Sequence, residues 1–254
     1  MAQVMTDFRN FQAAVCSIDD YHRQPVILGL KAGDTIGGPT AIAAVLAASV
    51  IDTGSYDREL TADCYLDWWK AEGFDTGAVF ALVMGARVEG ATTEEAVLHG
   101  HETLGGKSAG CSPAHRAPAL AVTLDADISG LVEVVKADAA LTHYDPLAGD
   151  VAAAVAVLCR VLMDGASWEE AKVVAADGRL QETVAAISGD GDALPSDGGY
   201  APEVLSAAVY FLDKYPPNLA LAAAKAFADG TNYCPVLVGA VDGARGYMST
   251  LTEP

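Results

Sequence analysis

The 254-residue chain has little of what marks several protein classes. Its five cysteines are an odd number with no Cys-x-x-Cys pair, so neither a disulfide framework nor a zinc site is expected. The longest run of mostly apolar residues, Ala41 to Ile51, is well short of the roughly 20 residues that a membrane span needs. Residues 1–11 mix acidic and basic side chains without a continuous apolar region, unlike a signal peptide. These absences predict a cytoplasmic protein with no membrane partner.

Positive charge and aromatic side chains are also scarce. The chain has 15 Lys and Arg against 34 Asp and Glu, which gives a formal net charge of -19. Such a surface repels phosphate backbones, so nucleic-acid binding is not expected; it favours solubility or salt adaptation, with a cationic partner as the alternative. Aromatic residues make up 7% of the chain and hydrophobic residues 52%, many of them alanine. Because alanine is the best helix former, this composition favours helices.

Helical patterns extend along the chain, and no segment alternates convincingly with the period of two that is typical of a strand. Asp57 is placed to cap a helix, and Thr92–Glu95 and Ser167–Glu170 have the spacing of a capping box. Proline and glycine bound three further predicted helices, over residues 146–165, 201–215 and 218–230. The sequence therefore predicts an all-α fold of about ten helices, a compact orthogonal bundle that forms one domain over residues 1–254.

Two loops are rich in small residues. Residues 105–113 read Gly-Gly-Lys-Ser-Ala-Gly-Cys-Ser-Pro, and successive N–H groups in such a turn before a helix suit a phosphate. A tight interhelical turn without a ligand is the alternative. Residues 188–199 are acidic and rich in glycine, but they lack the spacing and the terminal glutamate of an EF-hand loop. A solvated linker is predicted there.

Five segments follow one another in the order of a known set of motifs. They are residues 28–39 with Gly33-Asp34, residues 65–77 with Trp68-Trp69 and Phe74-Asp75-Thr76-Gly77, residues 108–116, Leu141-Thr142-His143, and Gly239-Ala240 with Gly243-Ala244-Arg245. In this order they resemble G-D-A-L-G-x-P-x-E, Y-L-x-W-Y…D-x-G, S-x-G-N-G-x-x-M-R, T-H and G-A-x-x-G-A-R of the ADP-ribosylglycohydrolases. This helical family includes dinitrogenase reductase-activating glycohydrolase. The resemblance, from about residue 26 onward, implies the family's helical fold and an ADP-ribosyl substrate.

The resemblance fails at the acidic positions. Members of the family bind two magnesium or manganese ions through three acidic clusters, and the glutamate of the first is replaced by Ala41. The second cluster, T-D-D-T, is absent. The third, G-D-x-D-T, falls on residues 229–233, where both liganding aspartates are missing. Because hard divalent cations need several anionic oxygens in one place, we expect a divergent member with no metal site and no cofactor.

By the resemblance, the loop before Pro113 would hold the ligand. Ser108 and Gly110 would contact a pyrophosphate, and Cys111 takes the place of an asparagine that contacts it. His143 would contact a ribose or phosphate, although a purely structural histidine is an equal alternative. His99 and His101 are expected to face solvent. The predicted substrate-binding residues are Gly77, Ser108, Ala109, Gly110, Cys111, Ser112, His143, Thr231 and Asn232.

Three residues are candidates for catalysis. Cys111 lies at a predicted helix start, where the helix dipole lowers the pKa of a thiol, and His115 lies one turn further on as its base. The alternative is that Cys111 only fills a packed turn. Asp34 is the carboxylate retained in a recognisable motif, and it is a candidate general base or, equally, a helix cap.

The preferred interpretation is a glycohydrolase-like enzyme that acts on a ribose-containing nucleotide or an ADP-ribosyl substrate without the binuclear metal site. The alternatives are a catalytically inactive protein that binds ADP-ribose or a nucleotide, and a metal-independent enzyme with a different reaction that uses Cys111 or Asp34. The sequence does not determine the oligomeric state.

Overall fold

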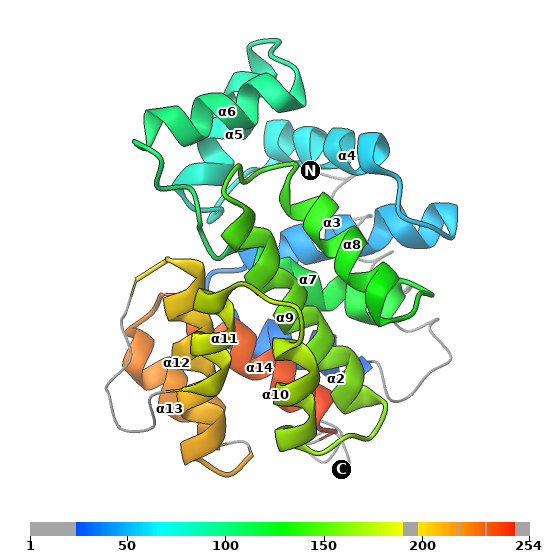
Figure 1. The fold of residues 1–254 in the computed structure, drawn as a ribbon. Coiled ribbons are helices and arrows are strands. Elements are labelled where there is room, and N and C mark those ends of the chain that lie inside the picture. Colours follow the sequence, from blue (N-terminus) through cyan, green and yellow to red (C-terminus); the bar gives the residue numbers. More distant parts are fainter. Residues whose placement is uncertain (1–23, 190–197, 218, 232, 247–254) are drawn as a thin grey trace.

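The computed structural model describes residues 24–189, 198–217, 219–231 and 233–246 (Figure 1). Within these ranges the chain forms thirteen helices and no β-strand, so the predicted all-α class is confirmed. The helices are α2 (Gln24–Gly33), α3 (Gly38–Thr53), α4 (Arg58–Ala71), α5 (Ala78–Val88), α6 (Thr93–Thr103), α7 (Ser112–Thr123), α8 (Ile128–Ala139), α9 (Pro146–Met163), α10 (Trp168–Ala176), α11 (Gln181–Ser188), α12 (Ala201–Lys214), α13 (Leu219–Ala228) and α14 (Cys234–Ala244). The sequence predicted about ten; the short helix α11, which starts with neither a capping side chain nor a proline, is one that it did not specify.

Local capping signals placed several helix starts correctly. The Asp57 carboxylate accepts a backbone N–H from the first turn of α4. Both predicted capping boxes form, with Thr92 before α6 and Ser167 before α10. The three helices predicted between prolines and glycines are α9, α12 and α13. Residue 218, the predicted start of the last of them, lies outside the described residues.

Helix α9 is the centre of the molecule. Helices α7, α8 and α10 pack against it. Among the described helices, α9 is the one long and apolar enough to cross a membrane by length and composition, but 83% of it is buried, as in a core helix. The guanidinium of Arg160 donates hydrogen bonds to the carbonyls of Ala121, Leu124 and Ala126. These bonds satisfy carbonyls at the end of α7 and in the loop that follows it, and they tie both to α9.

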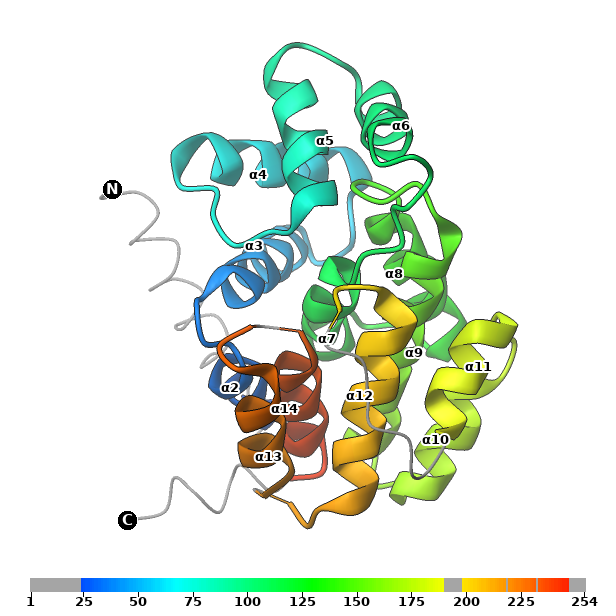
Figure 2. The same cartoon turned by 90° about the vertical axis from the view of Figure 1, so that its left-hand side faces the viewer.

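Helices α2 and α14 pack so closely that the backbone of each contacts the backbone of the other. A Cβ atom on Gly29 would lie 2.0 Å from the carbonyl oxygen of Gly239, and one on Gly239 would lie 2.0 Å from that of Gly29. Because the nearest atoms on both sides belong to the backbone, a side chain at either glycine would fit only if the two helices moved apart. Figure 2 shows the two helices side by side. Their contact fixes the start of α14 relative to that of α3, and both starts lie at the site described below.

The remaining helices lie at the two ends of this centre. Figure 1 shows α4, α5 and α6 at one end and α10 to α13 at the other, with α3, α7 and α9 between them. Several helices begin between these two ends, and their N-termini lie close together.

Candidate ligand-binding site

A cavity of about 840 Å³ lies where several helices begin. Its lining includes Pro39 of α3 and the residues that directly precede four other helices: Gly77 before α5, Cys111 before α7, Tyr200 before α12 and Tyr233 before α14. Asp145, which precedes α9, also lines it. The cavity is therefore surrounded by helix N-termini.

Most helix starts at this cavity lack a capping side chain. Of the helices described, α5, α7, α12 and α14 begin after residues whose side chains make no capping hydrogen bond. Helices α4, α6, α8 and α10 begin away from the cavity, and each is capped by an Asp, Thr or Ser side chain. Two helices depart from this pattern: α9 begins at the cavity and is capped by Asp145, and α11 begins away from it without a capping side chain. The N–H groups of a first helical turn carry partial positive charge and suit an anion. The residues that precede four such helices line one cavity in a chain whose net charge is -19.

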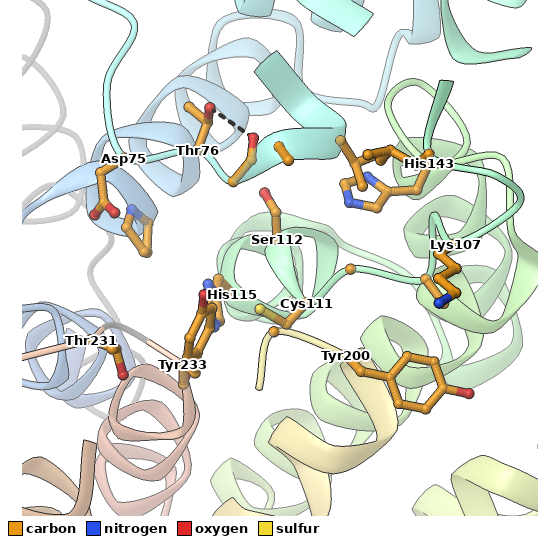
Figure 3. A pocket seen from close by; sticks show the side chains of 18 of the residues that line it. Asp75, Thr76, Lys107, Cys111, Ser112, His115, His143, Tyr200, Thr231 and Tyr233 are labelled. Carbon is orange, nitrogen blue, oxygen red and sulfur yellow. Dashed lines mark hydrogen bonds between the residues drawn. The ribbon is translucent and has the colours of Figure 1, made fainter. Parts of the chain in front are cut away.

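The loop predicted to bind the ligand forms one wall of the cavity. Ala109, Gly110, Cys111 and Ser112 line it, and Figure 3 shows Ser112 at the start of α7 with its hydroxyl in the open space. Cys111 N donates to the Gly199 carbonyl at 3.0 Å, so the loop pairs with the chain before α12. Gly199 belongs to the segment predicted to be a solvated linker; residues 190–197 of that segment lie outside the described residues.

Ser108 lies behind this wall and does not line the cavity. Its side chain is fully buried, and its hydroxyl is 2.6 Å from Nδ1 of His101 and accepts the Asp145 N–H at 3.2 Å. The His101 ring packs on Tyr144 with 4.5 Å between ring centroids. The Ser108 hydroxyl therefore supports the loop instead of making the predicted ligand contact. His99 is exposed as expected, whereas His101 faces solvent only in part, because its ring is half-buried between Ser108 and Tyr144.

His143 lines the cavity next to Gly110 of this loop. Its ring is 3% exposed, and Nδ1 is 2.8 Å from the hydroxyl of Thr142. Burial, together with the positive charge of Arg116, lowers the pKa of His143 well below its ordinary value. His143 is thus a neutral polar group in the cavity wall near neutral pH. Lys107, which is exposed, adds a positive charge to the lining (Figure 3).

Cys111 does not have the environment of a nucleophile. It is 6% exposed, and burial, reinforced by the charge of Asp75, raises the pKa of its thiol to about 12. This is opposite to the direction that the nucleophile hypothesis requires, because desolvation outweighs the helix dipole. His115 Nε2 donates to the carbonyl of Tyr233 at 3.0 Å, and burial lowers the pKa of His115 to about 4. His115 therefore joins α7 to the start of α14, and Cys111 fills a packed turn.

We expect Cys111 to resist alkylation. A thiol with a pKa of about 12 is ionised in roughly one molecule in 10⁵ at neutral pH. Iodoacetamide followed by peptide mass spectrometry should modify partly exposed Cys64 before Cys111. Cys159 is the matched control, because burial also raises its pKa to about 12. Labelling of Cys111 ahead of Cys64 would restore the nucleophile hypothesis.

Asp34 acts as a helix cap. Its carboxylate accepts the N–H of Gly37 at 2.7 Å and both the N–H and the hydroxyl of Thr40, at 2.8 and 2.6 Å. A negative charge at the start of α3 stabilises the helix. Asp34 does not line the cavity, so its predicted role as a general base has no geometric support. The carboxylate that lines the cavity on this side is Asp75.

Asp75 is held in an unusual conformation. Its backbone is left-handed, with φ of 50°, and its side chain accepts the Gly38 N–H at 3.2 Å. A Cβ on Gly38 would lie 2.3 Å from the Asp75 carbonyl oxygen, so only glycine fits there. A non-glycine residue in this region stores backbone strain, and such residues cluster at functional sites.

The described residues do not fit a binuclear metal centre. The cavity carboxylates Asp75 and Asp145 come from different elements, and each already accepts a backbone N–H. Ala41 supplies no oxygen ligand from its side chain. In the described part of the chain, no three His, Cys, Asp or Glu side chains gather in a way that could hold a metal ion. Two carboxylates are too few for a pair of hard divalent cations.

The structure thus brings most of the predicted site residues together. Gly77, Ala109, Gly110, Cys111, Ser112, His115, His143 and Thr231 all line the cavity, and Asn232 lies outside the described residues. Sequence reasoning missed Asp75, Lys107, Tyr200 and Tyr233 as lining residues. The sequence did contain a signal for Tyr200 and Tyr233, since each directly precedes a helix with proline in its first two positions. Five helices that begin at the cavity share this feature: α3, α7, α9, α12 and α14.

Comparisons with known proteins agree with this picture. The model of the ADP-ribosylglycohydrolase family matches residues 39–249. Among solved structures, 42 chains match significantly. One, described as an ADP-ribosylglycohydrolase-related protein complex, has a TM-score of 0.71 and 19% sequence identity, and the match covers 88% of this chain and 87% of that one. A search of curated proteins gives no significant match.

Proposed function

Since the chain belongs to the ADP-ribosylglycohydrolase family, we propose that its cavity binds an ADP-ribosyl group or a closely related ribose-containing nucleotide. The observation that carries this proposal is the convergence of the uncapped starts of α5, α7, α12 and α14 on the cavity. Positive helix ends favour a ligand that contains a diphosphate. The volume of about 840 Å³ also lies in the range of small-molecule sites, roughly 300–1,000 Å³.

The cavity offers a different group for each part of such a ligand. The start of α7 with Ser112, and the ammonium of Lys107, suit the diphosphate. The ring of Tyr200, which is 44% exposed at the cavity, offers a flat face for a base. A small-molecule partner and a cytoplasmic location belong to the same proposal.

Cleavage of a glycosidic bond in this cavity is the second candidate function. It is favoured by Asp75, a carboxylate that lines the cavity in a strained backbone conformation and could serve as a general acid or base. Because the carboxylates of a binuclear metal centre are lacking, this reaction would proceed without that centre. The described residues support binding more strongly than cleavage, since neither Cys111 nor Asp34 has the setting of a catalytic group.

Ser112→Asp tests the proposed binding site. The new carboxylate would lie at the start of α7, where negative charge stabilises a helix, but it would repel a phosphate. We expect the affinity for ADP-ribose, measured by calorimetric titration, to fall at least about tenfold. In the control variant Ser112→Asn, the new side chain has nearly the shape of aspartate but no charge, and the affinity should change by less than about threefold. Neither variant should lower the melting temperature appreciably.

Two outcomes would count against these proposals. Equal ADP-ribose affinity in Ser112→Asp and Ser112→Asn would place the phosphates away from α7.

For the second candidate function, cleavage of a glycosidic bond, the informative variant is Asp75→Asn with an ADP-ribosylated substrate. Release of ADP-ribose should stop while binding persists, and unchanged release would remove Asp75 from the reaction.

A further inference from the structure

A chain of buried side chains leads from Asp138 to the cavity and ends at His143. Arg116 Nε donates to Asp138 Oδ2 at 2.7 Å, and Arg116 Nη2 donates to the Thr142 hydroxyl at 3.0 Å. The same hydroxyl is 2.8 Å from Nδ1 of His143. None of the four residues is more than 3% exposed. We infer that Arg116 and Thr142 fix His143 as the neutral tautomer with its proton on Nε2, which makes it a hydrogen-bond donor to an oxygen of the ligand.

The hydrogen bonds of Thr142 decide the tautomer. Arg116 can only donate, so Oγ1 of Thr142 is its acceptor, and the hydroxyl has one hydrogen to give. Two acceptors compete for that hydrogen: Nδ1 of His143 at 2.8 Å and the carbonyl of Ala139 at 3.3 Å. The shorter contact is the stronger hydrogen bond. Nδ1 therefore carries the lone pair, and a neutral imidazole then has its hydrogen on Nε2.

The charge of Arg116 favours the same arrangement. The guanidinium lies on the Nδ1 side of the ring, beyond the Thr142 hydroxyl. A cation stabilises a lone pair that faces it and opposes an N–H dipole that points toward it. Asp138 neutralises Arg116 from the far side and also accepts the Tyr65 hydroxyl at 2.7 Å, so these groups are held in place. Arg116 and Thr142 are thus positioning residues for His143.

Nε2 of His143 is directed at the loop wall of the cavity. It lies 3.1 Å from the point where a side chain on Gly110 would place its Cβ, so the absence of a side chain at Gly110 keeps this space open. Within the described residues Nε2 has no hydrogen-bond partner, and His143 lines the cavity (Figure 3). The donor is available to a phosphate, hydroxyl or carbonyl oxygen. This last step rests on the proposed function, whereas the tautomer does not.

Nitrogen NMR of the full chain with ¹⁵N-labelled histidine tests the tautomer directly. The His143 signals, assigned by their loss in His143→Gln, should show a protonated Nε2 and an unprotonated Nδ1. They should remain so at pH 6.5, where an ordinary histidine is half protonated. A protonated Nδ1 in the unaltered protein would overturn the inference, whether or not any variant folds.

The role of Thr142 is tested by a pair of variants. Thr142→Val keeps the shape but removes the hydroxyl, and it should shift both His143 nitrogens toward a mixture of tautomers. Thr142→Ser should restore the signals of the unaltered protein. A Thr142→Val spectrum identical to that of the unaltered protein would contradict the positioning role, because a purely structural threonine would leave the tautomer unchanged.

The donor function is tested with ADP-ribose as the probe. His143→Gln retains an N–H donor near the position of Nε2 and should bind ADP-ribose within about threefold of the unaltered protein, whereas His143→Leu should lose about tenfold in affinity. Equal affinities in the Gln and Leu variants would overturn the donor function. If the unaltered protein does not bind ADP-ribose, the proposed function fails, and the NMR result still decides the tautomer.

Discussion

Replacing Gly239 with alanine should destabilise the protein by about 3 kcal/mol, near the upper end of overpacking effects. The added methyl group would lie 2.0 Å from the carbonyl oxygen of Gly29, on the facing helix. Helices α2 and α14 would have to separate, and Gly33 and Gly243 make equally close contacts with the facing backbone along the same interface. The free energy of unfolding, measured by urea titration, checks this expectation.

Gly85→Ala provides the matched control. Gly85 also lies within a helix, α5, but a Cβ there meets no atom within 4 Å, and the residue has no positive φ. The substitution should leave stability unchanged or raise it by up to about 1 kcal/mol, since alanine is the better helix former. Equal urea midpoints for Gly239→Ala and Gly85→Ala would show that the close approach of α2 and α14 is wrong.

Asp138→Ala should cost about 3–5 kcal/mol of stability, because it leaves the charge of Arg116 buried without its partner. The Arg116 and Asp138 side chains are 0% and 2% exposed and 2.7 Å apart. The hydroxyl of Tyr65 would lose its acceptor as well. Differential scanning calorimetry at neutral pH should show a large fall in melting temperature.

An exposed ion pair shows how much of this cost comes from burial. Arg58 and Glu94 lie 2.9 Å apart, but their side chains are 37% and 69% exposed. Glu94→Ala should therefore change stability by no more than about 1 kcal/mol. If Glu94→Ala and Asp138→Ala have similar effects, Asp138 is not the buried partner of Arg116, and the chain of side chains that leads to His143 loses its anchor.

Sequence reasoning succeeded where the signal is local. Capping boxes at Thr92 and Ser167, and the prolines and glycines around α9 and α12, depend on neighbouring residues alone, and these helices form as predicted. The close contact of Gly29 with Gly239 involves opposite ends of the chain. No local pattern specifies that pairing, so it became visible only in the folded structure.

The sequence predicted which segments form the candidate site but not which of their side chains face the ligand. The cause is again that the deciding contacts join residues distant in the sequence. The order of the motifs placed Gly110, Ser112 and His143 at one site, and all three line the cavity. Which serine of the loop faces the ligand depends on partners distant in the sequence: His101 holds Ser108 behind the wall, and Gly199 pairs with the loop. The reactivity of Cys111 depends on burial, which a helix-start pattern does not reveal.

We expect the cavity to bind its nucleotide without a pair of metal ions. The measurement that decides this is calorimetric titration of ADP-ribose into the protein, once after treatment with EDTA and once with excess magnesium. The two affinities should agree within about threefold, because the two carboxylates that line the cavity, Asp75 and Asp145, are too few to hold two divalent cations. Binding that appears only with magnesium, or no binding under either condition, would contradict the account.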